Sequence, residues 1–254
     1  MRRQGRRLAA AAAAGLAFAG FAALGVWQLD RLAWKEALIA AVDARVSAPP
    51  AAPPGPAAWP AVSAERDGYR HVRVNGVFDN ARETLVQAVT EAGPGFWVLT
   101  PLHTDQGFVV LVDRGFVPAD RAPQAARRPG LITGPTTVTG LLRPSEPHGG
   151  FLRANQPDAG RWYSRDVVEI AQARGLARAA PYFIDADATP ISGGWPRGGM
   201  TVVHFRNSHL SYALTWFALA GMTGLWGAWP FLEALRARRR RSGTALAPAH
   251  DALG

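Results

Sequence analysis

The chain has 254 residues, with 28 lysine and arginine residues against 19 acidic ones and no cysteine. Without cysteine it can form no disulfide, thiolate metal site or cysteine nucleophile. The formal net charge of +9 lies mostly at the chain ends, because residues 30–208 hold 19 basic and 17 acidic residues. A nucleic-acid-binding protein would carry a basic stripe on its folded domain, so we expect no nucleic-acid partner.

Two long segments without charged residues lie near the two ends of the chain. Residues 8–29 and 210–232 contain 22 and 23 residues, and a helix of that length spans about 33 Å, enough to cross a hydrocarbon core of about 30 Å. The sequence therefore predicts transmembrane helices at 8–29 and 209–232. The second is the stronger prediction because aromatic residues lie near its ends, namely Tyr212, Trp216, Trp226 and Trp229.

Arginine clusters flank both segments on their outer sides, within residues 1–7 and 233–254. The positive-inside rule then places both termini in the cytoplasm and residues 30–208 across the membrane. For a bacterial chain this means a multi-pass protein of the inner (plasma) membrane with a periplasmic central domain; in a mitochondrion that space would be the intermembrane space. Cleavage of the first segment as a signal peptide, after an A-x-A pattern at residues 17–19, stays open.

Residues 30–46 extend the first segment as a helix, and residues 47–61 form a linker, since six of the twelve residues 49–60 are proline. Residues 62–208 are predicted to form a β-rich domain with one helix, capped by Asp166 and ended near Gly175. Short strands are expected at 69–78, 84–89, 96–102, 108–112, 136–142, 162–165, 182–185 and 201–205. The predicted fold class is an integral membrane protein in which two transmembrane helices flank a β-rich α+β extracytoplasmic domain, barrel-like or sandwich-like.

No nucleophile, metalloprotease, phosphate-loop or dinucleotide motif occurs in the sequence. Asp113, Arg114 and Gly115 are interpreted as a turn that ends a strand, with a local ion pair. His103 lies two residues before Asp105, a spacing too common to indicate a metal site. The sequence therefore gives no argument for an enzyme.

His209 differs from the other histidines because it stands at the start of the second segment, where an ionisable residue is a functional hypothesis by default. Helical spacing places Tyr212, Ala213 and Trp216 on the same face. Imidazole is a common axial ligand of haem iron, the face below it could receive a porphyrin, and Arg206 could pair with the propionates. The alternative is a histidine that lies among lipid headgroups without a ligand.

Glycines recur in the first segment. The glycines meant are Gly15, Gly20 and Gly25. Because they have no side chain, they would let a second helix approach closely or would leave an apolar groove for a lipid-like tail.

Four segments match known signatures in the same order along the chain. They are LGVWQLDRLAWK at 24–35, FWVLTPL at 96–102, VLVDRGFVP at 110–118 and RNSHLSYALTWF at 206–217. They resemble the signatures of the surfeit-locus-protein-one family, called Shy-one in yeast. The resemblance covers about residues 20–230; Asp113 departs from it, because many members carry asparagine there.

The resemblance implies a cytochrome c oxidase assembly factor, a non-enzymatic membrane chaperone that promotes insertion of haem a into oxidase subunit I. By the same resemblance His209 would ligate the haem iron, and the cofactor site would include Tyr212, Trp216 and Arg206. Expected partners are oxidase subunit I, haem a synthase and the lipid bilayer. A second iron ligand is not assigned; His204 is the nearest histidine, and we expect it to face out of a strand.

Two alternatives remain open. The chain could be a protein-interaction scaffold that stabilises an oxidase assembly intermediate without carrying haem, in which case His209 would be dispensable. It could also be an extracytoplasmic enzyme, for which no motif argues.

Overall fold

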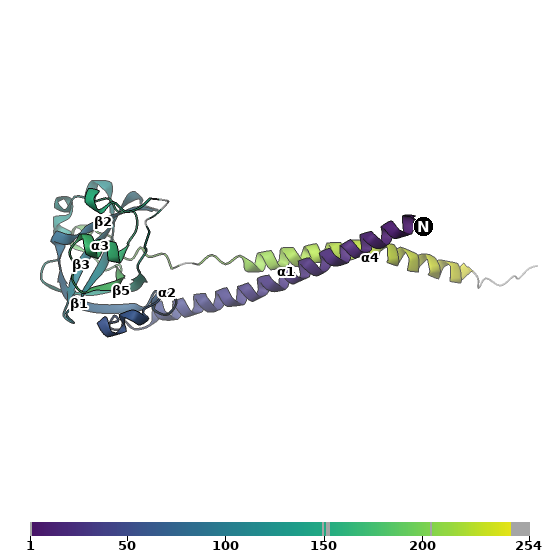
Figure 1. The fold of residues 1–254 in the computed structure, drawn as a ribbon, viewed down its shortest axis with the longest axis horizontal. Helices are drawn as coiled ribbons and strands as arrows, with labels where there is room; N and C mark the ends of the chain where they lie inside the picture. Colours follow the sequence, from purple (N-terminus) through teal and green to yellow (C-terminus); the bar gives the residue numbers. More distant parts are fainter. Residues whose placement is uncertain (1, 149, 151–152, 204, 245–254) are drawn as a thin grey trace, which may run out of the picture. The chain divides into compact units, whose positions relative to one another are not determined.

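The computed structural model describes residues 2–148, 150, 153–203 and 205–244, with the backbone alone described at 2–4, 7 and 238–244. The chain divides into two compact units. One comprises the residues up to 39 together with those from 205 onward, and the other comprises residues 40–204. Figure 1 labels most of their helices and strands, and the two units are described separately below.

Residues 40–204 form a β-barrel. The sheet order is β1-β5-β6-β4-β3-β2, and a further pairing of β1 with β3 closes five strands into a ring, from which β2 extends beside β3. All neighbours are antiparallel except β4 and β6, which are parallel. The strands are β1 (His71–Phe78), β2 (Thr84–Thr90), β3 (Gly93–Thr104), β4 (Val109–Pro118), β5 (Pro135–Pro144) and β6 (Ala179–Ala186).

The barrel closes at Gly76. In β1 buried and exposed residues alternate, so Val72 and Val74 point into the barrel. Gly76 pairs with Thr136 of β5 on one side and with Thr104 of β3 on the other. A Cβ atom at Gly76 would collide with the carbonyl oxygen of His103, so the closure requires a residue without a side chain.

Two apolar clusters fill the domain. The first lies inside the barrel and includes Val72, Leu102, Tyr182 and Ile184. The second includes residues of α3 (Val167–Ala173), which cover the other face of β4 and β6, together with Trp162, Leu111 and Phe183. Because β4 lies between β3 and β6 and is covered on both faces, nine of its ten residues are buried.

The structure confirms a barrel and the helix that follows Asp166. The Asp166 carboxylate accepts hydrogen bonds from the backbone N–H groups of Val168 and Glu169, and Gly175 ends the helix with a φ of +61°. A four-residue helix, α2 (Ala64–Asp67), precedes β1.

Three predictions for this domain are wrong. Residues 162–165 form only one isolated bridge, between Val86 and Trp162, and residues 201–203 and 205 form no strand. Asp113, Arg114 and Gly115 do not end a strand but lie inside β4. Gly115, with a φ of +115°, lets the strand continue where a Cβ atom would collide with the Arg197 carbonyl group.

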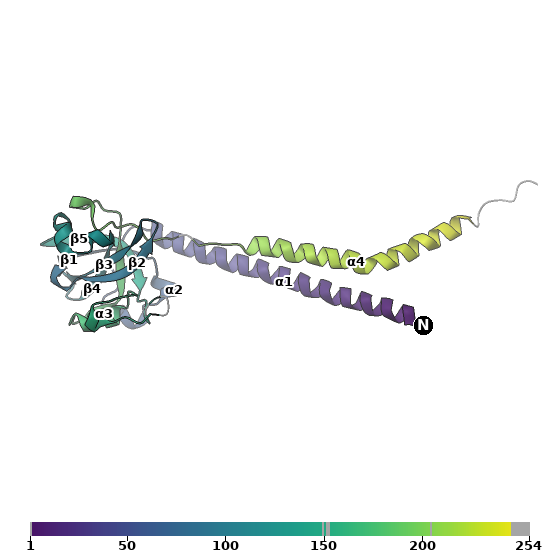
Figure 2. The ribbon, with the colours of Figure 1, turned by 90° about the horizontal axis from the view of Figure 1, so that it is seen from above.

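The other unit contains two long helices. A single helix, α1 (Arg2–Ser47), contains both the segment 8–29 and its extension 30–46, and α4 (His209–Thr244) contains the second apolar segment. Figure 2 shows α4 bent part-way along its length, and Pro230, which cannot donate a backbone hydrogen bond, lies inside it.

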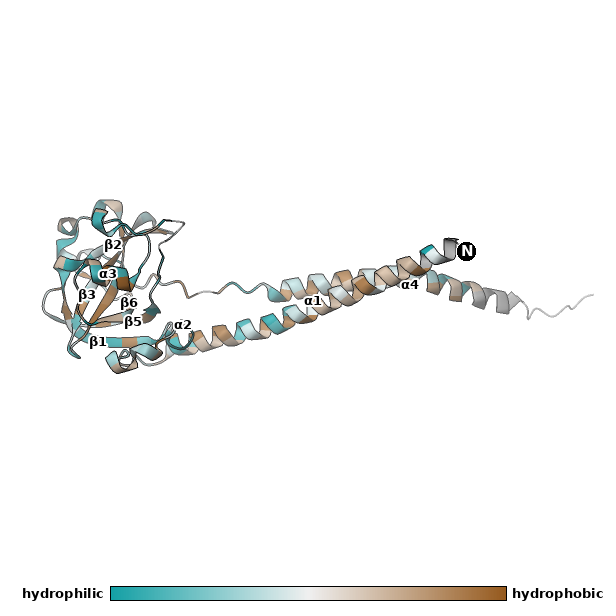
Figure 3. Ribbon diagram, in the orientation of Figure 1, coloured by the Kyte–Doolittle hydropathy of each residue, from teal (hydrophilic) through white to brown (hydrophobic). Residues whose placement is uncertain are grey.

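Only one helix of the described residues is long and apolar enough to cross a membrane, and it is the portion Leu8–Ser47 of α1. Figure 3 shows the apolar colouring of α1 mainly in its N-terminal half. Among the described residues the second predicted transmembrane helix, in α4, does not reach that apolar character, so it stays a prediction. The reason is composition: tryptophan, tyrosine, threonine and glycine recur along α4 and lower its mean hydropathy.

Candidate functional site

The two helices pack through small and aromatic residues. A Cβ atom at Gly25 of α1 would lie 2.6 Å from the ring of Phe217 on α4, so this contact depends on glycine. Phe21 and Trp216 stack with ring centroids 5.7 Å apart. At Gly15 and Gly20, by contrast, a Cβ atom would meet no described residue within 4 Å, so of the three predicted glycines only Gly25 serves close packing.

One polar contact joins the helices within this apolar interface. His209 Nδ1 lies 2.7 Å from Gln28 Oε1, and Gln28 is only 8 % exposed. An amide oxygen can only accept, so Nδ1 donates its hydrogen. The Nε2 atom of the neutral ring then carries the lone pair, and among the described residues it has no hydrogen-bond partner. A histidine held through one ring nitrogen, with the other available, is the usual arrangement of a metal-ligating histidine.

The other predicted site residues lie around this contact in different ways. Ala213 is buried and Trp216 is half-buried against α1, as expected for residues on the face of His209, whereas Tyr212 is 53 % exposed. Arg206 is exposed ahead of α4 and forms no ion pair with any described residue. Their part in cofactor binding stays a prediction, and His204 lies outside the described residues.

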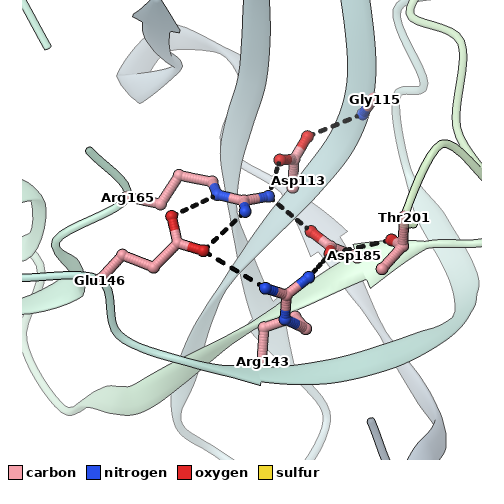
Figure 4. Close-up of polar contacts among 7 residues, drawn as sticks. All are labelled: Asp113, Gly115, Arg143, Glu146, Arg165, Asp185 and Thr201. Carbon is pink, nitrogen blue, oxygen red and sulfur yellow. Dashed lines mark hydrogen bonds and ion pairs between the residues drawn. The ribbon is translucent and has the colours of Figure 1, made fainter. Parts of the chain in front are cut away.

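The barrel contains a second concentration of polar groups, a charge network centred on Arg165 (Figure 4). Arg165 Nη1 donates to Asp113 at 3.0 Å and to Asp185 at 3.1 Å, and its Nε and Nη2 atoms donate to Glu146 at 3.0 and 2.7 Å. Arg143 bridges Asp185 and Glu146 at 2.9 and 3.4 Å. We call these five residues the Arg165 network.

Every carboxylate of the network is paired with a guanidinium group, but three carboxylates face only two guanidinium groups. With all groups ionised, the network therefore carries one excess negative charge. Burial, and then the charge of Asp185, raises the pKa of Asp113 to about 7, although Arg165 and the backbone N–H of Gly115 favour its ionised form. Burial opposes the charge of Arg165, but the carboxylates of Asp113, Asp185 and Glu146 outweigh it and raise the pKa of Arg165 above its usual value, so it remains charged.

The network ties several parts of the domain together. Asp113 lies on β4, Arg143 on β5 and Asp185 on β6, and Glu146 and Arg165 come from loops. The Thr201 hydroxyl also donates to Asp185 at 2.9 Å and so holds the segment after β6. Every carboxylate is engaged by a neighbouring side chain, so the arrangement is suited to holding the barrel together rather than to binding a metal; no group of three or more His, Asp or Glu residues among the described residues could hold one.

Sequence reasoning missed this network. The interpretation of Asp113 as part of a local ion pair is wrong, because its partner Arg165 is 52 residues away. A signal was present: charged residues inside the apolar strands 110–118 and 182–185 need buried partners. The sequence could not say which arginines supply them.

Comparison with known proteins decides the family. The model of the SURF1 family matches residues 15–221, a stretch that includes Gln28, the whole barrel and His209. The chain belongs to the SURF1 family. Surfeit locus protein 1 of Mus musculus is 37% identical over 220 residues, covering 80% of this chain and 70% of the mouse protein. Its Homo sapiens counterpart is 37% identical over 221 residues, covering 80% and 71%.

A SURF1-like protein of Monosiga brevicollis covers more of both chains. It is 38% identical over 239 residues, which is 89% of this chain and 87% of the relative. The similarity to the SURF1 family therefore extends over the helices as well as the barrel.

Proposed function

We propose that this SURF1-family protein is a non-enzymatic membrane chaperone for cytochrome c oxidase assembly, which carries haem a as cargo to oxidase subunit I. The observation that carries the proposal is the hydrogen bond between His209 Nδ1 and Gln28 Oε1. It joins two helices that each bear one of the family's terminal signatures, and it leaves Nε2 as the ligand atom.

The residues present fit an axially bound haem. His209 offers one nitrogen in a defined tautomer, at the end of an interface made of small and aromatic side chains. Tyr212, half exposed beside it, offers an aromatic face to the porphyrin, and the exposed guanidinium of Arg206 offers a partner to the propionates. With a single protein ligand the cargo could be released to subunit I, which a carrier requires.

The haem content of purified full-length protein tests this proposal. Cells that make haem a would express the wild type, His209→Ala, Gln28→Leu and, as the matched control, His103→Ala, which removes a histidine that is 53% exposed on the barrel. We expect the wild type and the control to carry haem a and His209→Ala to carry none. Gln28→Leu should carry less haem than the wild type, because the imidazole of His209 then loses the hydrogen bond that orients it.

Equal haem in the wild type and His209→Ala would overturn the ligand assignment. No haem in any variant, with oxidase assembly still dependent on the protein and indifferent to His209→Ala, would favour a scaffold that stabilises an oxidase intermediate.

The proposal includes a place in the cell: the bacterial inner membrane, with both termini cytoplasmic and residues 30–208 periplasmic. The apolar helix Leu8–Ser47 supports one membrane span, and the arginine clusters within residues 2–7 and 236–241 support the orientation. A periplasmic reporter fused after residue 120 should be active, and one fused after residue 250 should be inactive. The reverse pattern would contradict this topology, and a shortened N-terminus in the purified protein would show a cleaved signal peptide.

A further inference from the structure

Arg114 is a buried cation on β4 that the Arg165 network does not include. Its residue exposure is 2 %. Nη2 donates to the carbonyl oxygen of Gly130 at 2.5 Å, Nη1 makes a 3.4 Å contact with Asn80 Oδ1, and the guanidinium lies 4.9 Å from the centroid of the Phe78 ring. These contacts engage two of its five N–H groups, and no acidic residue of the described chain lies within ion-pair distance.

Glu83, the acidic residue whose charge acts on Arg114, is paired with another arginine. Arg127 binds the Glu83 carboxylate with both Nη atoms, one of them at 2.8 Å, and both of these side chains are buried. Glu83 is therefore paired directly with Arg127 and not with Arg114. Burial lowers the pKa of Arg114 to about 10, with Glu83 opposing and Arg127 adding to the shift, so Arg114 remains charged at neutral pH. A buried charge without a counter-ion is costly, which makes this position suited to an anionic ligand.

A cavity of about 310 Å³ adjoins this cation. Arg114 lines it together with apolar side chains, among them Phe78, Val138, Ile132 and Ile191, and with several threonine and serine hydroxyls. Its outer wall is formed by the exposed residues Thr189 and Ser192. A small cavity in which apolar side chains surround a few placed polar and charged groups is the usual form of a site for a small organic molecule.

We propose that this cavity binds a small organic monocarboxylate, with its carboxylate on Arg114 and its apolar body against Phe78, Val138 and Ile191. A guanidinium group has the planar pair of donors that matches a carboxylate. A phosphate dianion fits less well, because the Asp187 carboxylate also lines the cavity, where it lies 3.2 Å from His71 Nε2. His209 and the helix pair play no part in this site, so the inference does not depend on the proposed function.

Calorimetric titration of the full-length protein in a neutral detergent tests the proposal with three probes of one shape. Benzoate has the carboxylate, benzamide is its neutral counterpart, and phenyl phosphate carries the larger charge. We expect benzoate to bind with one-to-one stoichiometry and benzamide to bind at least about tenfold more weakly, because only benzoate compensates the charge of Arg114. Equal affinity for benzoate and benzamide, or no binding of benzoate, would overturn the proposal. Tighter binding of phenyl phosphate than of benzoate would overturn the choice of a monocarboxylate.

A pair of variants at the rim separates binding from folding, since Arg114→Met could also unfold the barrel. Thr189 is exposed, so Thr189→Glu and Thr189→Gln should both fold, and they differ only by one negative charge facing the cavity. Thr189→Glu should weaken benzoate binding about tenfold by repulsion, whereas Thr189→Gln should stay within about threefold of the wild type. Identical benzoate affinities for the two variants would contradict a site at this position.

Discussion

The helix pair and the Arg165 network of the barrel differ in how their buried polar groups are hydrogen-bonded. In the Arg165 network each carboxylate is engaged by at least one neighbouring side chain, and the five residues are held by elements far apart in sequence. Between the described residues of α1 and α4 a single polar contact, from His209 to Gln28, interrupts packing by glycine, alanine and aromatic residues. One ring nitrogen of His209 is left without a partner among the described residues.

This difference separates groups that serve folding from groups available for binding. Each carboxylate of the Arg165 network is paired with a guanidinium group, so the network mainly contributes rigidity. His209 and Arg114 are each fixed by a neighbour and still have unused capacity, one as a nitrogen ligand and the other as a cation. By this criterion we place the two proposed binding functions at those positions.

The largest expected effect is the loss of the cation at the centre of the network. Arg165→Met should lower the free energy of unfolding of the barrel by about 3–5 kcal/mol, because it leaves the Asp113 and Asp185 carboxylates buried without that partner. Hydrogen exchange of the β4 and β6 amides in the full-length protein measures this. The control Arg82→Met breaks a surface pair with Asp79 and should cost less than about 1 kcal/mol. A loss from Arg165→Met as small as that of the control would show that the network does not stabilise the barrel.

A smaller loss is expected where the two helices touch. Gly25→Val should weaken their association by about 1–3 kcal/mol, because the new side chain collides with Phe217, while Gly20→Val meets open space and should have little effect. Two cysteines introduced together, Ala14→Cys on α1 and Gly227→Cys on α4, measure this association, because a Cβ atom at 227 would lie 2.8 Å from that of Ala14. The chain has no other cysteine, so any disulfide must join these two positions. Gly25→Val should slow disulfide formation in this background. Equal rates for the two glycine variants would mean that the helices do not pack as described.

The smallest expected effect concerns the pH dependence of the barrel. The pKa of Asp113 is raised in the folded chain, so between about pH 4 and 7 the folded state holds a proton that the unfolded state has released. The stability that this proton provides is present at low pH and is lost as the pH rises through about 7. Relative to the wild type, Asp113→Asn should therefore gain about 2 kcal/mol in free energy of unfolding from pH 5 to 8. Hydrogen exchange of β4 amides across this range checks it, and parallel profiles for the two proteins would rule out the raised pKa.

The sequence by itself determined the family, the two helical segments, the position of most strands and the singular place of His209. These follow from local properties, namely uninterrupted apolar runs, alternation in strands such as His71–Phe78, and four motifs in order. It was wrong where distant neighbours decided the conformation: residues 162–165 are predicted as a strand, but Trp162 fills the second core cluster beside α3.

Only the tertiary structure decided which polar residues meet. Gln28 and His209 are 181 positions apart, and Arg165 and Asp113 are 52 apart, so no spacing rule connects them. The same holds for Arg114, which reads in sequence like a residue of a turn and is a buried cation beside a cavity. The physical reason is that hydrogen bonding and burial depend on distance in space. Periodicity fixes which way a side chain points from its own helix or strand, and the closure of the barrel and the packing of the helices fix what it finds there.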